Sequence, residues 1–208
     1  DNVRNEVTAF RSRSGKYVFI CADGFTSSEW RIVPTANPMA APRVIAPRRG
    51  NVEYSVEHSG EFFYIYTNDT ARNFRIVRAL EDDPSPANWK DWLAHRDTAF
   101  VEGIDVFERH AVVRERTEGL RRLRVTELAT NYSHLVAFPE SAYSVFVGWN
   151  PEFDTDMVRF TYASPVTPSS VYDYNMATQQ RELKKRQEIP SGFDASRHEV
   201  QRRVAPAR

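Results

Sequence analysis

The sequence has little cysteine and little glycine, and it contains no long apolar run. Its single cysteine, Cys21, excludes an internal disulfide, so stability must come from a packed core. The eight glycines include no pair four residues apart, which excludes the G-x-S-x-G nucleophile elbow. The spacing of the glycines also excludes the sequence motifs of dinucleotide-binding folds and of P-loops. Apolar runs are only as long as strands, and none approaches the roughly 18 residues of a membrane-spanning helix.

An excess of charge of one sign is also lacking, because 28 basic residues balance 28 acidic ones. A nucleic-acid partner usually demands a basic face, so none is expected, and no membrane partner is expected either. The chain begins with Asp1 and shows no basic-then-apolar leader. We therefore expect a cytoplasmic piece of a larger protein.

What the sequence does contain is a pair of apolar strands that recurs four times. One member occupies residues 30–33, 74–77, 123–125 and 171–174, with starts 44, 49 and 48 residues apart. The preceding member occupies residues 17–20, 62–65, 111–113 and 158–161, with starts 45, 49 and 47 apart. A period of roughly 40 to 50 residues in strand-rich sequence is typical of propeller blades, each a four-stranded sheet.

We therefore predict an all-β fold, a partial β-propeller of about four blades, each a four-stranded antiparallel sheet. The predicted propeller covers residues 1–190, with blades at 1–50, 51–100, 101–142 and 143–190. Residues 191–208 lose the strand pattern and are interpreted as a linker. Within the second blade, residues 89–93 are expected to form one helical turn. The predicted strands are residues 7–10, 16–21, 29–33, 43–46, 52–56, 62–67, 73–79, 103–107, 111–116, 123–128, 134–138, 144–149, 157–162, 170–174 and 181–186.

No local motif predicts a catalytic, cofactor-binding or metal-ligating residue. The zinc motif H-E-x-x-H starts at His198 but has Arg202 where the second histidine belongs. The acidic residues 152–156 could hold calcium, but a solvated turn whose acids cap their own backbone is the favoured interpretation. The basic residues 183–186 are interpreted as the charged face of an edge strand. The sequence does not exclude a catalytic site formed by a Ser, a His and an Asp that come together from distant positions.

Particular residues resemble those of one known family over nearly all of the chain. The most specific stretch spans residues 150–156 and is followed by Arg159, Tyr162, Ser164, residues 167–170 and residues 171–176. Further matching positions are residues 52–54 with His58, residues 67–68, 73–75, 95–96 and 115–116, and Gly119 with Leu120. In these residues the chain resembles the prolyl oligopeptidase family of serine peptidases, in its oligopeptidase B (protease II) branch. It departs from that pattern at Ala195, where Pro is usual, and at His198, where Tyr is usual.

The resemblance implies a parent enzyme in which a seven-bladed propeller caps an α/β-hydrolase domain that carries the Ser, Asp and His. The parent would cleave short peptides after Arg or Lys, without metal or organic cofactor. This chain would supply about the last four blades and then the linker to the catalytic domain, its partner. No catalytic residue carries over, so the chain alone is expected to be inactive. The propeller would act as a gate that admits short peptides and excludes folded proteins.

Two other functional classes stay open, and the open arc raises a question of its own. A freestanding interaction module would present aromatics on its surface; Trp89 and Trp92 are the candidates, but we interpret them as packing residues. An enzyme with its own site would gather carboxylates or histidines in a central channel. An arc of four blades leaves two blade faces bare, so we expect a marginal or homo-oligomeric fragment.

Overall fold

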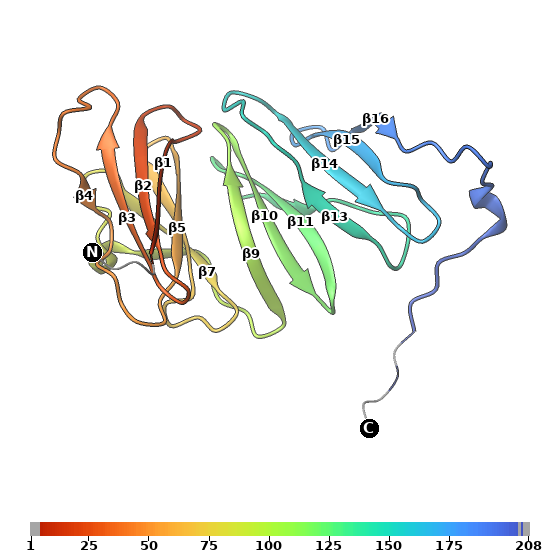
Figure 1. The fold of residues 1–208 in the computed structure, drawn as a ribbon, viewed down its shortest axis with the longest axis horizontal. Coiled ribbons are helices and arrows are strands. Elements are labelled where there is room, and N and C mark those ends of the chain that lie inside the picture. The colour runs from red at the N-terminus through yellow and green to blue at the C-terminus, as the bar shows by residue number, and fades with distance from the viewer. Residues whose placement is uncertain (1–4, 204, 206–208) are drawn as a thin grey trace.

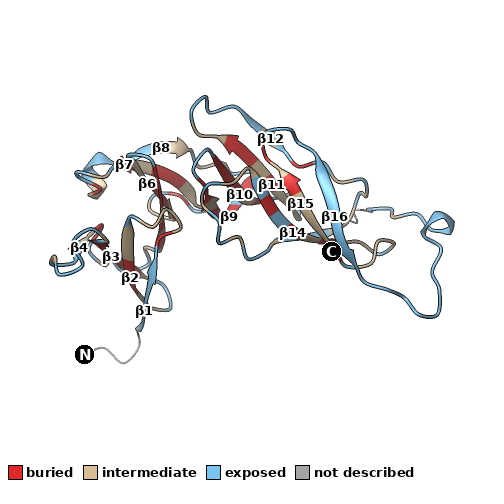
Figure 2. Cartoon of the chain, turned by 90° about the horizontal axis from the view of Figure 1, so that it is seen from above, coloured by how far each residue is buried: buried red, intermediate tan, exposed pale blue. Residues whose placement is uncertain are grey.

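The computed structural model of the chain describes residues 5–203 and 205. Sixteen strands form four antiparallel sheets, and each sheet contains four strands that are consecutive in the sequence (Figure 1). The sheets stand side by side in chain order and form a curved arc when seen from above (Figure 2). The predicted all-β partial propeller of four-stranded antiparallel blades is therefore confirmed. The described part of the chain contains no helix long and apolar enough to cross a membrane.

The first blade consists of β1 (Glu6–Arg11), β2 (Tyr17–Asp23), β3 (Ser28–Pro34) and β4 (Arg43–Val44). The second consists of β5 (Tyr54–Ser59), β6 (Phe62–Thr67), β7 (Arg75–Leu80) and β8 (Lys90–Leu93). The third consists of β9 (Ala99–Val106), β10 (His110–Thr117), β11 (Leu120–Glu127) and β12 (Ser133–Leu135). The fourth consists of β13 (Ser144–Val147), β14 (Met157–Ala163), β15 (Ser170–Asn175) and β16 (Arg181–Arg186).

The helical turn predicted at residues 89–93 is wrong. Residues Lys90–Leu93 are strand β8, which pairs with β7 and closes the second sheet. A short 3₁₀-helix, η1 (Pro86–Asn88), lies just before it. Trp89 packs against the first core cluster and Trp92 against another, so each ring covers a different blade junction. Strand β2 also runs on to Asp23, two residues beyond the end of the predicted strand 16–21.

The hydrophobic core is divided among the three junctions between neighbouring blades. The first cluster joins Phe19 and Trp30 of the first blade to Phe63 of the second. A further cluster joins Tyr64 of the second blade to Val101 of the third, and the last joins the third blade to the fourth. Strand β6 is buried on both faces, because Phe63 points into one junction and Tyr64 into the next. The strand is therefore sandwiched between two blades, which suits its continuous apolar run.

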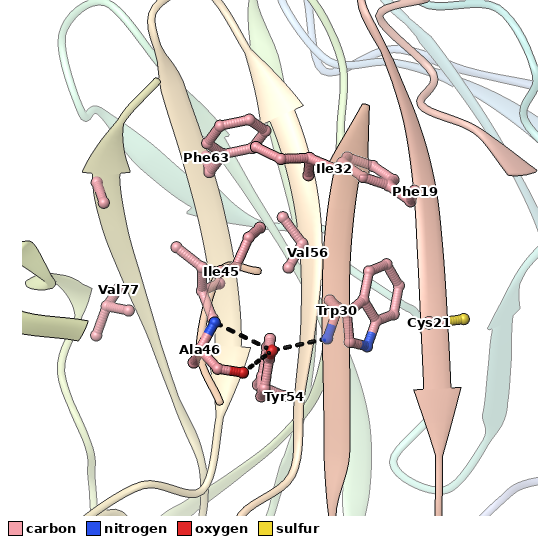
Figure 3. Close-up of a cluster of buried hydrophobic side chains, with 12 residues drawn as sticks. Phe19, Cys21, Trp30, Ile32, Ile45, Ala46, Tyr54, Val56, Phe63 and Val77 are labelled. Atoms are coloured by element: carbon pink, nitrogen blue, oxygen red, sulfur yellow. Dashed lines mark hydrogen bonds between the residues drawn. The ribbon is translucent and has the colours of Figure 1, made fainter. Parts of the chain in front are cut away.

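Tyr54 fastens the first junction with polar bonds inside the apolar cluster (Figure 3). Its hydroxyl accepts hydrogen bonds from the backbone N–H groups of Trp30 (2.7 Å) and Ala46 (3.2 Å) and donates to the Ala46 carbonyl (2.7 Å). The Ser28 hydroxyl bonds the backbone of Tyr54 at both its carbonyl (2.8 Å) and its N–H (2.6 Å). Burial raises the pKa of Tyr54 to about 12, so the phenol stays neutral at physiological pH.

A second polar connection crosses the same junction through His58, whose side chain is 1% exposed. Its Nδ1 lies 2.7 Å from the Ser14 hydroxyl, and its Nε2 lies 2.5 Å from Oε1 of Glu81. Lys16 of the first blade binds the same carboxylate oxygen at 3.1 Å. Burial lowers the pKa of His58 and outweighs the opposing effect of Glu81. The neutral ring therefore donates to Glu81 and accepts from Ser14.

Removing the Tyr54 hydroxyl should loosen the first junction. In Tyr54→Phe, two backbone N–H groups and one carbonyl lose their buried partner, so unfolding free energy should fall by about 2–3 kcal/mol. Urea denaturation followed by tryptophan fluorescence measures this. Tyr132→Phe is the matched control, because Tyr132 is 61% exposed and should change stability little. Equal effects of the two substitutions would contradict the role of Tyr54.

Acid should weaken the His58 connection. The folded state holds the His58 pKa below its ordinary value of about 6.5, so the unfolded chain binds the proton first. The stability from neutral His58 is complete above that pH and is lost as pH falls through the folded-state pKa. His58 should therefore lower the urea midpoint as pH falls from 8 to 5, so the change in midpoint over this range should be more negative in the wild type than in His58→Gln.

A pH dependence should remain in His58→Gln, because burial also lowers the pKa of His110 and of His134 and raises the pKa of Glu57. His198→Gln, at an exposed position, should keep the pH dependence of the wild type. An unchanged pH dependence in His58→Gln would show that this junction does not sense protons.

Candidate functional site

A charged cluster lies where the first three blades converge on the concave side of the arc. Arg13, in the turn after β1, reaches past the second blade to the third. Its guanidinium pairs with Asp105 at 3.0 Å and donates to the Val106 carbonyl at 3.0 Å. The same group lies 4.7 Å above the centre of the Phe107 ring. Such a contact between non-adjacent blades is possible only where the blades approach one another, on the inner side.

Asp105 is shared between two arginines, and a glycine makes room for the second of them, Arg114. Arg114 lies 3.4 Å from the second oxygen of Asp105. Opposite Arg114 stands Gly103, at φ +148°, where a Cβ would overlap the Arg114 guanidinium. The pairing of β9 with β10 shifts by one residue directly after this position. This bulge and the glycine together let the arginine lie flat over β9.

Glu57 of β5 is the group in this cluster without a fixed partner. Within the described residues its carboxylate has neither a hydrogen bond nor an ion pair. Burial raises the pKa of Glu57 to about 7; Arg13 and Arg114 oppose the rise, and Asp105 adds to it. A carboxyl group that is half ionised near neutral pH, in a cavity, is a candidate functional residue on physical grounds.

A cavity of about 580 Å³ opens beside this cluster. Trp149 forms part of its wall and is 87% exposed. The loop that carries Trp149 is held by Asn150, whose amide donates to the Gly148 carbonyl (2.8 Å) and accepts from the Arg159 N–H (2.7 Å). The lining residues are Phe10, Arg11, Ser12, Arg13, Gly15, Phe19, Glu57, Trp149, Asn150 and Pro151.

This arrangement is suited to binding rather than to nucleophilic chemistry. Its polar groups are arginines, an amide and a titratable carboxyl, set among aromatic rings. In the part of the chain that the structure describes, no group of three or more His, Cys, Asp or Glu is placed to hold a metal ion.

A serine, a histidine and a glutamate, rather than the aspartate considered from the sequence, come together as Ser14, His58 and Glu81. The ring presents Nδ1 to the serine and Nε2 to the acid, the reverse of the usual triad orientation. His58 is also sealed inside a packed blade junction, where a substrate could not reach it. We therefore interpret this hydrogen-bond chain as a structural fastener.

The acidic loop at residues 152–156 is solvated as predicted, with the Asp154 side chain 73% exposed, but its acids do not cap their own backbone. Asp154 and Asp156 bind the guanidinium of Arg109, at 2.8 and 3.1 Å, and so join the third blade to the fourth. The backbone cap comes from Thr155, whose hydroxyl accepts from the Met157 N–H. The sequence did not reveal these ion pairs, because the acids and their arginine stand 45 and 47 residues apart.

Other sequence interpretations are confirmed. Strand β16, which contains the basic residues 183–186, is an exposed edge strand. Trp89 donates its indole N–H to the Pro84 carbonyl at 2.9 Å, and Trp92 donates to the Asn131 amide at 3.0 Å. Both tryptophans are therefore packing residues.

Sequence reasoning missed the concave cluster, although a signal for it was present. Arg13, Glu57, Asp105 and Trp149 are separated by 44, 48 and 44 residues, the same period as the blades. A repeat places equivalent positions at the same level around a propeller, so residues that keep the period can converge. Their different chemical types hid the pattern, because similarity of side chains was what defined the repeat.

The chain was compared with known proteins. The family described as prolyl oligopeptidase, N-terminal beta-propeller domain, matches residues 2–187. The dipeptidyl aminopeptidase BI of Pseudoxanthomonas mexicana is 44% identical over 199 residues, which is 95% of this chain and 27% of that protein. Protease 2 of Moraxella lacunata is 26% identical over 187 residues, which is 89% of this chain and 26% of that protein.

Among solved structures, oligopeptidase B from Leishmania major superimposes with a TM-score of 0.87 at 24% identity, over 97% of this chain and 30% of that one. This likeness shows the fold. The chain thus spans between a quarter and a third of the length of the relatives it matches. From its blades and the family match together, the chain belongs to the prolyl oligopeptidase family, in the family's N-terminal β-propeller domain.

Proposed function

We propose that this chain is the non-catalytic, gating part of a longer serine oligopeptidase. The observation that carries the proposal is the match of residues 2–187 to the propeller domain of that family. In this proposal the propeller occupies residues 1–190, and residues 191–208 lead to an α/β-hydrolase domain that provides the Ser, Asp and His. The blades would narrow the route to the catalytic site, so that short peptides enter and folded proteins do not. We place the parent enzyme in the cytoplasm, in keeping with one free, buried cysteine.

The segment after β16 has the properties that a hinge requires. Its side chains from Gln187 to Glu199 are exposed. It touches the blades at few points, among them a bond from the Ser141 hydroxyl to the Val200 carbonyl (2.8 Å) and the contact of Arg202 with Glu118. Few buried contacts mean a low free energy of local opening. A domain attached through this segment could therefore swing relative to the blades.

Two substrate preferences are compatible with the relatives. The oligopeptidase B resemblance favours cleavage of short peptides after Arg or Lys. The relative at 44% identity bears the name dipeptidyl aminopeptidase, which favours removal of dipeptides from a free N-terminus. The two differ in whether the substrate must have an unblocked amino group.

Hydrolysis assays should separate the parent activity from the role of this chain. The 208-residue chain should cleave neither an N-blocked fluorogenic peptide with Arg before the scissile bond nor a dipeptidyl substrate with a free N-terminus. The same chain extended through a hydrolase domain should cleave at least one. Cleavage of the blocked substrate indicates an endopeptidase, and cleavage of the free one alone indicates dipeptide release.

The gating role needs its own comparison within the extended chain. The same cleavable sequence should be cut in a short peptide and spared in a loop of a folded protein. Hydrolysis by the 208-residue chain itself would refute a non-catalytic role, and equal cutting of peptide and folded protein would refute the gate.

We also propose that the isolated arc associates with itself through its two end blades. Apolar side chains are exposed at both ends: Val7 (66%) on β1, and Phe146 (55%) and Met157 (36%) on the fourth blade. Sedimentation velocity should show concentration-dependent oligomers, and Phe146→Ser should weaken them. A wild-type monomer at every concentration would argue against this association.

A further inference from the structure

The concave cavity is large enough, and chemically specific enough, to bind a ligand. Its volume of about 580 Å³ falls within the range of small-molecule sites, roughly 300 to 1,000 Å³. Strands of the first and second blades and the loop after β13 contribute to its wall, so it is built by residues far apart in the sequence. The gating role proposed above uses none of these side chains.

Two of its polar groups have charge to offer a ligand. Arg13 is already neutralised by Asp105. Arg11 of β1 donates its Nε–H to the Gly15 carbonyl at 3.2 Å and has no ion pair within the described residues. Glu57 of β5 likewise lacks a partner there. The cavity therefore offers one spare cation and one spare carboxyl group, on two different strands.

The two spare groups select against a simple ion. An inorganic anion would be drawn to Arg11 but would repel ionised Glu57. A lone cation would be drawn to Glu57 but would face Arg11 and Arg13. A ligand that carries both charges can satisfy both groups, because both line the same cavity.

The remaining wall is aromatic. Phe10 is 45% exposed and Trp149 is 87% exposed, so both rings can still bury apolar surface. The loop that carries Trp149 is held by the two bonds of Asn150, so ordering it costs little entropy on binding. Such rings favour an apolar or aromatic side chain on the ligand.

We propose that this cavity binds a short peptide with free termini, its carboxylate on Arg11, its ammonium on Glu57 and a side chain against Trp149. The proposal deepens the oligopeptidase function and rests on it, because short peptides are the substrates and products of such an enzyme. The cavity would hold one of them in the propeller, apart from any covalent step.

Binding of the ammonium group should depend on pH. Arg13, Arg114 and Asp105 face Glu57, and burial leaves its pKa at about 7 in the empty cavity. An entering ammonium stabilises the ionised carboxylate, so affinity should rise from pH 6 to pH 8. At pH 6 binding should release a proton, which calorimetry in two buffers of different ionisation enthalpy detects.

The test uses alanyl-phenylalanine, its N-acetyl form and its C-terminal amide with the 208-residue chain, followed by calorimetry and by Trp149 fluorescence. Each blocked form should bind about tenfold more weakly, the loss expected for one charge-assisted hydrogen bond. Glu57→Gln should weaken the free dipeptide about as much as N-acetylation does, and should not weaken the N-acetyl form further. Likewise, Arg11→Met should weaken binding of the free dipeptide about as much as C-terminal amidation does, and should not weaken binding of the amide further.

Matched controls are Glu61→Gln and Arg72→Met, at exposed positions outside the cavity, with circular dichroism to verify the fold of every variant. No saturable binding of the dipeptide, or equal losses in Glu57→Gln and Glu61→Gln, would overturn the site. If the extended chain nevertheless hydrolyses peptides, those results would refute dipeptide binding in the cavity and leave the proposed gating function intact. Failure of the extended chain to hydrolyse any peptide would instead refute the proposed function.

Discussion

The fold depends on one constraint: each blade has two apolar faces, and only another blade can cover them. The core is accordingly not one centre but three junctions, each made from two neighbouring sheets. Strand β6 shows the constraint most clearly, because its alternate residues Phe63 and Tyr64 are buried in different junctions. Polar bonds then fix the angle between blades, as Tyr54 does for the first pair. Packing supplies the free energy, while these directional bonds select one arrangement.

The residues that make this chain resemble its family are largely such fasteners. Tyr54 and His58 tie the first blade to the second, and the loop at residues 150–156 ties the third to the fourth. Glu115, buried between Arg96 and Arg124, joins the link after the second blade to the third. The resemblance therefore reports how blades are joined, and it carries information about fold far more directly than about chemistry.

The sequence predicted the blades well because their signal is local. Apolar runs such as residues 62–67 define a strand without reference to the rest of the chain. The prediction failed at residues 89–93, where the partner strand β7 decides the conformation. The candidate site was harder still, because Glu57 is an ordinary polar residue of an alternating strand until Arg13, Asp105 and the burial around it are known. A pKa depends on neighbours that only the closed arc brings together.

The bond from Arg13 to Asp105 has a consequence for how the arc comes apart. Stacked repeats that touch only their nearest neighbours can fray one unit at a time from either end. Arg13 instead links the first blade to the third, so the first blade cannot detach without also disturbing a strand two units away. The opposite end has no described counterpart to this link, and every residue of its outermost strand β16 is exposed. The two ends of the arc therefore differ in local stability. The N-terminal blade is tied to the third blade, whereas the C-terminal blade, next to the segment that leads out of the arc, is held less firmly.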